Sequence, residues 1–542
     1  MPTHLKRIIP GLILFITFGA QAGTWTQLAH PAPYFINQLL LLSDGTVMAQ
    51  GDQTTNWYRL TPDVHGSYVN GTWSSLASMR YTRLYYSSEV LTNGRVIVAG
   101  AEYGTGTANS EVYDPLSNTW TMASIPPGVV ASGGFVDSIS SMLPDGNVLC
   151  APVHPATNGY TAVYVTASNM WTTGPKLFRG GNQDEASWVT LPDSSILTID
   201  PFGENSERFI PSLNRWINDT TVGQAMYNVQ GELGAALLLP NGQAFFLGGN
   251  GNTALYTPTG TTSPGKWTAG PVIPDGYGIN DAPAAMMVNG KILCDVGNPT
   301  NYNEPSYFFE YHPVANSFSQ VNGPTGTSDD VPPYYGIMLD LPDGTVLYSD
   351  TLTILYDYQP SGSPLAAGQP TITGISENAD GSYTLTGTLL NGISEGASYG
   401  DDAQMNSNYP LVRVTNSVGN VYYERTYNWR STGVMTGSAP ETTLFTNSAG
   451  LPPGTYSLVV VANGISSAPF NFFIEPRLRM ASSANNVILT WPTNAVGFSL
   501  ETTTNLNHVV WTAGLPTPVV VSGQYVVTNP ISGTQRFFRL SQ

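Results

Sequence analysis

A turn signal that recurs seven times constrains the fold of this chain more than any other feature. Short apolar runs meet at paired turn residues, and glycine is the second residue of most pairs, which favours a tight hairpin between two strands. The pairs are separated by roughly 48 to 54 residues, a period typical of repeated β-sheet units. They are Asp44-Gly45, Asn93-Gly94, Asp145-Gly146, Asp193-Ser194, Asn241-Gly242, Asn289-Gly290 and Asp343-Gly344.

Each unit carries signals for four strands. In the unit at residues 83–121, a second hairpin follows the first, with strand-like residues on either side of the turn residues Asp114-Pro115. Seven such units predict an all-β fold, a seven-bladed β-propeller of the kelch type over residues 23–365. An aromatic residue marks the fourth strand of other units at Trp73, Trp171, Trp216, Trp267 and Phe318.

The seventh unit reaches a Pro- and Ser-rich linker at residues 359–364 before any fourth-strand tryptophan appears. The missing strand is found at the other end of the chain, where Thr24-Trp25-Thr26 repeats the pattern of Thr119-Trp120-Thr121. A propeller protects its strand edges, so an unfilled edge in the last blade is unfavourable. We therefore predict that the strand of Trp25 pairs with the strand of Tyr356 and closes the ring.

The first residues of the chain predict export. Lys6 and Arg7 precede an apolar run at residues 8–19, which is followed by an A-x-A cleavage motif and is too short to span a membrane. We expect residues 1–22 to be removed by cleavage after Ala22, giving a secreted or periplasmic protein without a membrane span. The formal net charge of −18 argues against a nucleic-acid partner. We expect a monomer.

The two cysteines are predicted to be free. Cys150 and Cys294 each lie five residues after the first turn residue of their units, the third and the sixth. Equivalent strands of non-neighbouring blades lie farther apart than the ~7 Å between Cα atoms that a disulfide spans. Both thiols should therefore be buried and pack as small apolar groups.

Beyond the linker the pattern of strands changes. Residues 370–476 contain six short apolar or alternating runs separated by turns, which predicts an immunoglobulin-like β-sandwich. The sandwich lacks the Cys…Trp…Cys pattern of antibody domains. Residues 477–542 have their own strand-like runs and predict a small C-terminal β-module, similar to those of secreted bacterial proteins.

Several stretches resemble the galactose oxidase and glyoxal oxidase family. Residues 83–88 (RLYYSS) are similar to the blade that carries the cross-linked tyrosine, residues 331–346 (VPPYYGIMLDLPDGTV) to the last blade, and residues 451–456 (LPPGTY) to the final hairpin of the sandwich. The resemblance covers roughly residues 24–476. It implies a propeller followed by a sandwich, with copper held by two tyrosines and two histidines.

Position by position, the resemblance implies that Tyr85 is the cross-linked tyrosine, Tyr103 the aromatic residue that covers it and Tyr334 the axial tyrosine. The two histidine positions carry Tyr335 and Arg425 instead, and Arg425 would bring a positive charge to the channel. A guanidinium has no lone pair for copper, and the chain's six histidines lack the spacing that places two imidazoles on one metal. We therefore expect no copper and assign no metal ligand.

Acidic residues are expected at one mouth of the propeller channel. The inner strands begin at this mouth, so residues eight or nine positions before each turn pair should surround it, as Tyr85, Tyr334 and Tyr335 do in their blades. The acidic residues at such positions are Asp137, Asp184, Glu185, Glu232 and Asp281. Three roles stay open for them: internal pairing with arginine, binding of a hard cation such as Ca²⁺, or acid–base chemistry.

Carboxylates that face aromatic rings are typical of carbohydrate-binding sites, because carboxylates accept hydrogen bonds from hydroxyls and rings stack on sugars. We interpret the chain as an exported propeller that binds a glycan or a cell-surface partner, with Ca²⁺ as the one cofactor left open. Two enzymatic alternatives remain. One is a copper-radical carbohydrate or alcohol oxidase with a rearranged site, and the other is a sugar lyase or epimerase that works without copper.

Overall fold

Strands form almost all of the regular structure. The computed structural model describes residues 22–542 except 132–133, 202, 401–403, 449, 514 and 534, so most of the predicted signal peptide lies outside the described residues. Within the described residues, no helix is long and apolar enough to cross a membrane. The short 3-10 helices are η1 (Pro211–Leu213), η2 (Pro274–Gly276), η3 (Pro333–Tyr335) and η4 (Ala366–Gly368).

The predicted seven-bladed propeller is confirmed: seven four-stranded antiparallel units follow one another along the chain. Blade one consists of β2 (Ile36–Leu41), β3 (Val47–Gly51), β4 (Trp57–Thr61) and β5 (Thr72–Ser75). Blade two consists of β7 (Ser87–Val90), β8 (Val96–Ala99), β10 (Ser110–Asp114) and β11 (Thr119–Met122). Blade three consists of β12 (Ile139–Met142), β13 (Val148–Ala151), β14 (Tyr160–Val165) and β15 (Met170–Lys176). Blades four and five consist of β16 (Trp188–Thr190), β17 (Ile196–Ile199), β18 (Asn205–Ile210) and β19 (Arg215–Thr221); and β20 (Leu233–Leu238), β21 (Ala244–Gly248), β22 (Thr253–Thr257) and β23 (Lys266–Ala269). Blades six and seven consist of β24 (Ala284–Met286), β25 (Ile292–Val296), β26 (Tyr307–His312) and β27 (Ser317–Val321); and β28 (Ile337–Asp340), β29 (Val346–Ser349), β30 (Tyr356–Gln359) and β1 (Thr24–Gln27).

A cross-strand aromatic pair recurs between the third and fourth strands of most blades. Tyr113 lies opposite Trp120 in blade two with ring centroids 5.2 Å apart, and Tyr256 lies opposite Trp267 in blade five at 5.1 Å. Such pairs contribute about 0.5–1.5 kcal/mol beyond the area they bury. The aromatic residue that marks each repeat in the sequence is therefore a packing residue. The same register joins Tyr164 to Trp171, Phe209 to Trp216 and Tyr311 to Phe318.

The N-terminal strand closes the ring, as predicted. β1 pairs antiparallel with β30, and Trp25 lies opposite Tyr358, with ring centroids 4.7 Å apart. The indole N–H of Trp25 also donates a hydrogen bond to the carbonyl oxygen of Asn322 in the neighbouring blade, at 2.7 Å. The aromatic pair of the seventh blade is thus made by residues from the first and the last strand of the propeller sequence.

We expect Trp25→Ala to lower the free energy of unfolding by about 2 kcal/mol, because the half-buried indole packs against Phe308, Tyr348 and Tyr358. Urea denaturation followed by circular dichroism measures the change. Val314→Ala, at a fully exposed turn residue, is the control and should be neutral. Equal midpoints for Trp25→Ala and the unchanged protein would show that the closing strand does not stabilise the ring.

A hairpin from the C-terminal half enters the propeller channel, which the sequence did not predict. It consists of β33 (Gly396–Ser398) and β34 (Gln404–Asn406), and β33 pairs with β24, the inner strand of blade six. Glu89 of blade two accepts a hydrogen bond from Asn406 at 2.7 Å, and Asp340 of blade seven accepts one from Ser407 at 3.2 Å. The hairpin therefore connects several blades from inside the channel, at the inner edges of their sheets.

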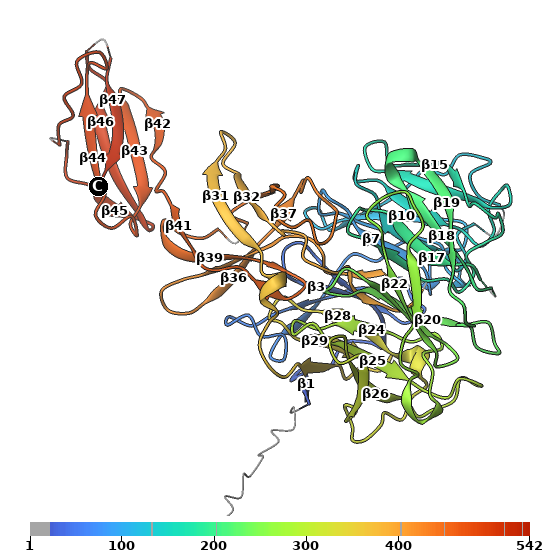
Figure 1. Cartoon of the computed structure of the whole chain (residues 1–542). Coiled ribbons are helices and arrows are strands. Elements are labelled where there is room, and N and C mark those ends of the chain that lie inside the picture. The colour runs from blue at the N-terminus through green and yellow to red at the C-terminus, as the bar shows by residue number, and fades with distance from the viewer. Residues whose placement is uncertain are drawn as a thin grey trace, which may run out of the picture.

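The predicted sandwich is confirmed as two sheets packed over one apolar core. A separate C-terminal module of two sheets follows, and its strands lie at the far end of the molecule from the propeller (Figure 1). The sandwich strands are β31 (Thr371–Glu377), β32 (Tyr383–Thr388), β38 (Glu441–Phe445) and β37 (Thr426–Tyr427) in one sheet, and β36 (Val421–Glu424), β35 (Leu411–Thr415), β39 (Gly454–Ala462), β40 (Ile465–Ser466) and β41 (Phe470–Ile474) in the other. The module strands are β42 (Arg479–Ser483), β43 (Asn486–Pro492), β46 (Gln524–Pro530) and β45 (Val519–Val521), with β44 (Ser499–Thr503) and β47 (Phe537–Ser541).

Both cysteines are free, as predicted. Cys150 lies in β13 and Cys294 in β25, and both side chains are fully buried. Burial raises the pKa of the Cys150 thiol to about 12, so it stays protonated and unreactive at neutral pH. The two thiols are packing residues.

Candidate functional site

A cavity of about 670 Å³ opens where the inner strands of the propeller begin. The structure brings most of the predicted mouth residues to this cavity: Tyr85, Tyr103, Glu185, Glu232, Asp281, Tyr334 and Tyr335 line it. Asp137 and Asp184 lie beside it, next to Glu185. Spacing along the sequence therefore predicted the place of all five acids and of Tyr85, Tyr334 and Tyr335, and the family resemblance predicted that of Tyr103.

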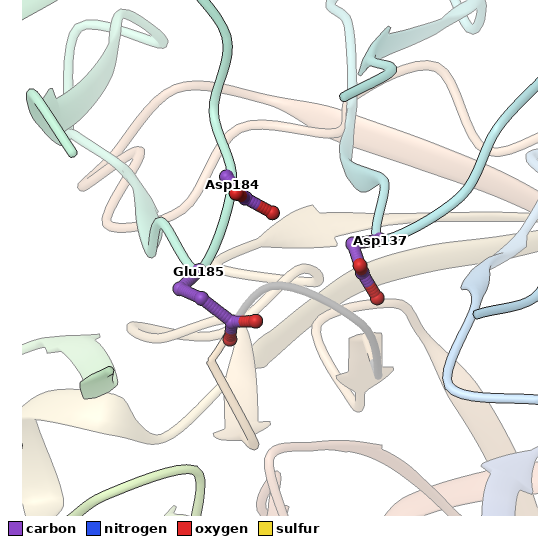
Figure 2. Close-up of side chains that lie close together, drawn as sticks. All are labelled: Asp137, Asp184 and Glu185. Carbon is purple, nitrogen blue, oxygen red and sulfur yellow. The ribbon is translucent and has the colours of Figure 1, made fainter. Parts of the chain in front are cut away.

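The five acids form two overlapping groups that share Glu185. In the first group, carboxylate oxygens of Asp137, Asp184 and Glu185 all lie within 4.8 Å of one another, and Figure 2 shows the three side chains converging on one space. In the second, oxygens of Glu185, Glu232 and Asp281 meet the same limit. Residues from four successive blades thus contribute to one acidic wall.

The backbone that carries these residues is strained in a repeated way. Tyr85, Asp137, Glu185 and Asp281 each lie eight positions before a turn pair, and each has a left-handed φ between 41° and 55°. This conformation costs a non-glycine residue on the order of 1–3 kcal/mol and gathers at functional sites. The rigid blades therefore hold the mouth residues in a conformation that those residues do not prefer.

The electrostatics of the wall disfavour full ionisation. Burial, followed by the charges of Glu102, Asp184 and Glu232, raises the pKa of Asp137 to about 8. Burial also raises the pKa of Asp184. None of the described residues that line the cavity has a basic side chain. The negative charge is therefore not balanced from within the cavity.

Glu102 and Tyr302 are mouth residues that sequence reasoning missed. They come from loops between the second and third strands of blades two and six, whereas the spacing from the turn pairs predicts only mouth residues just before the inner strands. Glu102 directly precedes β9 (Tyr103–Gly104), which pairs with β6 (Arg83–Leu84), and the Glu102 N–H donates to the Leu84 carbonyl oxygen at 3.0 Å. The adjacent Tyr103, assigned from the family resemblance, could have pointed to this loop.

Glu232 is the most buried acid of the wall, with only 6% of its surface exposed. One of its carboxylate oxygens accepts a hydrogen bond from the hydroxyl of Tyr302. The other carboxylate oxygen is buried and has no hydrogen-bond partner among the described residues. A buried carboxylate oxygen without a partner costs free energy unless a ligand supplies one.

Aromatic rings line the rest of the cavity wall. Tyr85 stacks on Tyr399 with centroids 5.9 Å apart and an interplanar angle of 20°, while Tyr334 lies 4.8 Å from Tyr335. The hydroxyl of Tyr399, at the end of β33, donates to the carbonyl oxygen of Tyr334 at 2.7 Å. The channel hairpin therefore supplies an aromatic residue beneath the mouth.

The expectation that Arg425 reaches the mouth is wrong. Its guanidinium donates to the carbonyl oxygen of Asn93 at 2.6 Å and lies over the ring of Tyr427. Asn93 is in the β7–β8 turn, at the opposite end of β7 from Tyr85. The physical reason is that the sandwich reaches the channel through β33 and β34, whereas the segment of Arg425 packs on the turns at the far end.

Comparison with solved structures shows that the chain is similar to a fungal alcohol oxidase of the AA5 family in complex with copper, with a TM-score of 0.50, 13% identity and coverage of 84% of this chain and 100% of that chain. It is also similar to the extracellular domain of a one-component system protein from B. thetaiotaomicron (TM-score 0.42, 11% identity, 84% and 57% covered) and to YCF48 from Cyanidioschyzon merolae (TM-score 0.43, 14% identity, 63% and 100% covered). No protein-family model and no curated protein matches the chain. The likeness to the oxidase supports the predicted galactose oxidase-like fold.

The residues at the mouth do not fit a copper-radical centre. Their donor atoms are carboxylate and phenol oxygens, and the described lining residues include neither histidine nor cysteine. Copper(II) sites in proteins rely on imidazole or thiolate donors, whereas oxygen donors suit hard cations. His30 and His312 hydrogen-bond Gly71 and Ser319, neither of which lines the cavity.

Proposed function

We propose that this protein binds a carbohydrate at the mouth of its propeller and does not use a copper-radical site. One observation carries the proposal: exposed aromatic side chains gather at a cavity whose other wall is acidic. The exposed aromatic residues that line the cavity are Phe35, Tyr103, Tyr302 and Tyr335. Tyr34 packs edge-on against Phe35, with ring centroids 5.5 Å apart.

The chemistry of the two walls matches a hydroxyl-rich ring. Exposed aromatic rings offer flat apolar faces for stacking, and an exposed patch of this kind marks a binding surface. The carboxylates accept hydrogen bonds from hydroxyl groups, and such bonds to charged acceptors are stronger than neutral ones. The cavity volume of about 670 Å³ lies within the usual range for small-molecule sites.

The signal-like first residues support a role outside the cytoplasm, where glycans of cell surfaces are accessible. Lys6, Arg7 and the apolar run at residues 8–19 carry this part of the proposal. The partner would therefore be an extracellular or cell-surface glycan.

A second candidate function is a lyase or epimerase that acts on sugars without copper. It is favoured by Asp137, because the carboxyl with a pKa of about 8 is protonated at neutral pH and can donate a proton. Pairs of carboxyl groups with separated pKa values are typical of acid–base sites. Product analysis of the bound glycans separates this activity from binding alone.

We expect a glycan array to identify a ligand, and titration calorimetry to show that Tyr103→Ala and Tyr335→Ala each weaken its binding about tenfold, because each loses a stacking face worth about 1.4 kcal/mol. Phe473→Ala is the matched control, since this ring is similarly exposed but lies in β41 of the sandwich. Binding that survives both mouth substitutions, or no glycan binding by the unchanged protein, would refute the proposal.

A further inference from the structure

We infer that Glu185, Glu232 and Asp281 form a Ca²⁺ site in the acidic wall of the propeller mouth. The inference goes beyond carbohydrate binding, since the ion is expected to bind in the absence of any glycan. Three independent features support it: the convergence of the oxygens, the buried carboxylate oxygen of Glu232 and the charge of the surroundings.

The oxygens converge to within the distance that one ion can bridge. One carboxylate oxygen from each of the three residues lies within 4.8 Å of the others. Calcium binds oxygen at about 2.3–2.6 Å, so two oxygens on one ion are separated by at most about 5 Å. The spacing of the three carboxylates is therefore compatible with one calcium ion held between them.

The buried oxygen of Glu232 points to a missing ligand. The Tyr302 hydroxyl satisfies one carboxylate oxygen of Glu232, and the second has no partner among the described residues although 94% of the residue is buried. Glu232 lines the cavity together with Glu185 and Asp281. A cation at this place would supply the missing interaction, which the neighbouring carboxylates cannot supply.

The charge of the surroundings favours a divalent ion. Asp137 and Asp184 extend the wall through Glu185, and Glu102 and Asp52 also face or line this region, with no basic side chain among the described lining residues. These carboxylates repel one another at such short range, and a divalent cation offsets that repulsion.

The donor set selects calcium among the common divalent ions. All donors are oxygens, whereas zinc sites use histidine or cysteine. Calcium takes six to eight oxygen ligands in flexible geometry, and magnesium demands a regular octahedron at shorter distances. Three carboxylates fill only part of the calcium shell, so its remaining positions are open to water or to ligand hydroxyls.

Terbium luminescence and thermal melting test the site on the full chain after treatment with a chelator. We expect Tb³⁺ emission sensitised by nearby Tyr302 and Tyr334, displacement of Tb³⁺ by Ca²⁺, and a rise of several degrees in melting temperature with Ca²⁺ alone. Glu232→Gln and Asp281→Asn should each weaken Ca²⁺ binding about tenfold or more, because affinity depends on the charge of the ligands.

Asp145→Asn is the matched control, because this exposed aspartate lies in the β12–β13 turn at the other end of the propeller. It should bind Ca²⁺ as the unchanged protein does. Wild-type Ca²⁺ affinity in both mouth variants would overturn the inference, as would an unchanged protein that neither displaces Tb³⁺ nor melts higher with Ca²⁺. Glycan binding measured with chelator present tests the proposed function separately.

Discussion

Arg83→Met is expected to lower the free energy of unfolding by about 3–5 kcal/mol, the cost of leaving a buried charge without its partner. Arg83 is fully buried and forms an ion pair with Glu111 at 2.9 Å, and the exposed fractions of the two side chains are 0% and 1%. Its guanidinium also donates to the carbonyl oxygens of Gly106 at 3.1 Å and Asn109 at 3.0 Å. Loss of these bonds would release the loop that carries Glu102 and Tyr103, so glycan binding should weaken as well.

Two further variants separate the ion pair from general damage. The double variant Arg83→Met/Glu111→Leu should recover part of the lost stability, because it removes the uncompensated carboxylate. Arg477→Met breaks an exposed ion pair with Glu377 and should cost less than about 1 kcal/mol. Chemical denaturation measures all three, and equal losses for Arg83→Met and Arg477→Met would contradict a special role for the buried pair.

The second large effect concerns pH and the channel hairpin. Glu89 is fully buried, bonded to Asn406 of the hairpin and to Ser140 of blade three. Burial, together with the charge of nearby Glu395, raises the pKa of Glu89 from 4.5 to about 8. The folded protein therefore binds this proton more tightly than the unfolded chain does.

The sign of the effect follows from linkage. The contribution of Glu89 to stability is fully present below pH 4.5 and is lost as pH rises to about 8. At about 1.4 kcal/mol per pKa unit, the loss amounts to at most about 5 kcal/mol. Glu89→Gln keeps the side chain neutral, so it should match the unchanged protein near pH 5 and exceed its stability near pH 8.5.

Urea denaturation at the two pH values measures this difference. Glu204→Gln, at an exposed glutamate, is the control and should leave the pH dependence unchanged. If Glu89→Gln loses as much stability between the two pH values as the unchanged protein, ionisation of Glu89 does not weaken the contact between blade two and the channel hairpin. The remaining dependence would then be sought at Asp340, whose pKa burial also raises to about 8.

Local patterns in the sequence were enough to predict the propeller. Turn pairs such as Asn93-Gly94 specify hairpins through the backbone conformation of two residues. The signals that determine the four strands of one blade therefore lie within about 50 residues of the sequence. The repeat also sets the register, so a residue eight positions before a turn pair lies at the start of the inner strand, or two or three residues before it, in every blade. This is why the mouth positions of Asp137, Glu185 and Asp281 could be predicted, and why the closure by Trp25 could be inferred from a missing strand.

Only the tertiary structure revealed what fills and completes the mouth. Residues 396–406 are polar and lack the alternation of a strand, so nothing local shows that β33 and β34 enter the channel and that β33 pairs with β24. Tyr399, Tyr302 and Glu102 reach the site from segments between strands, where the sequence has no repeated pattern. Arg425 illustrates the converse, because a similar stretch of sequence placed it at the mouth while packing of the sandwich holds it at the far end. Contacts between segments hundreds of residues apart depend on which buried polar groups can form hydrogen bonds with each other. The residues that decide this are distributed over the whole chain, so no local pattern reveals these contacts.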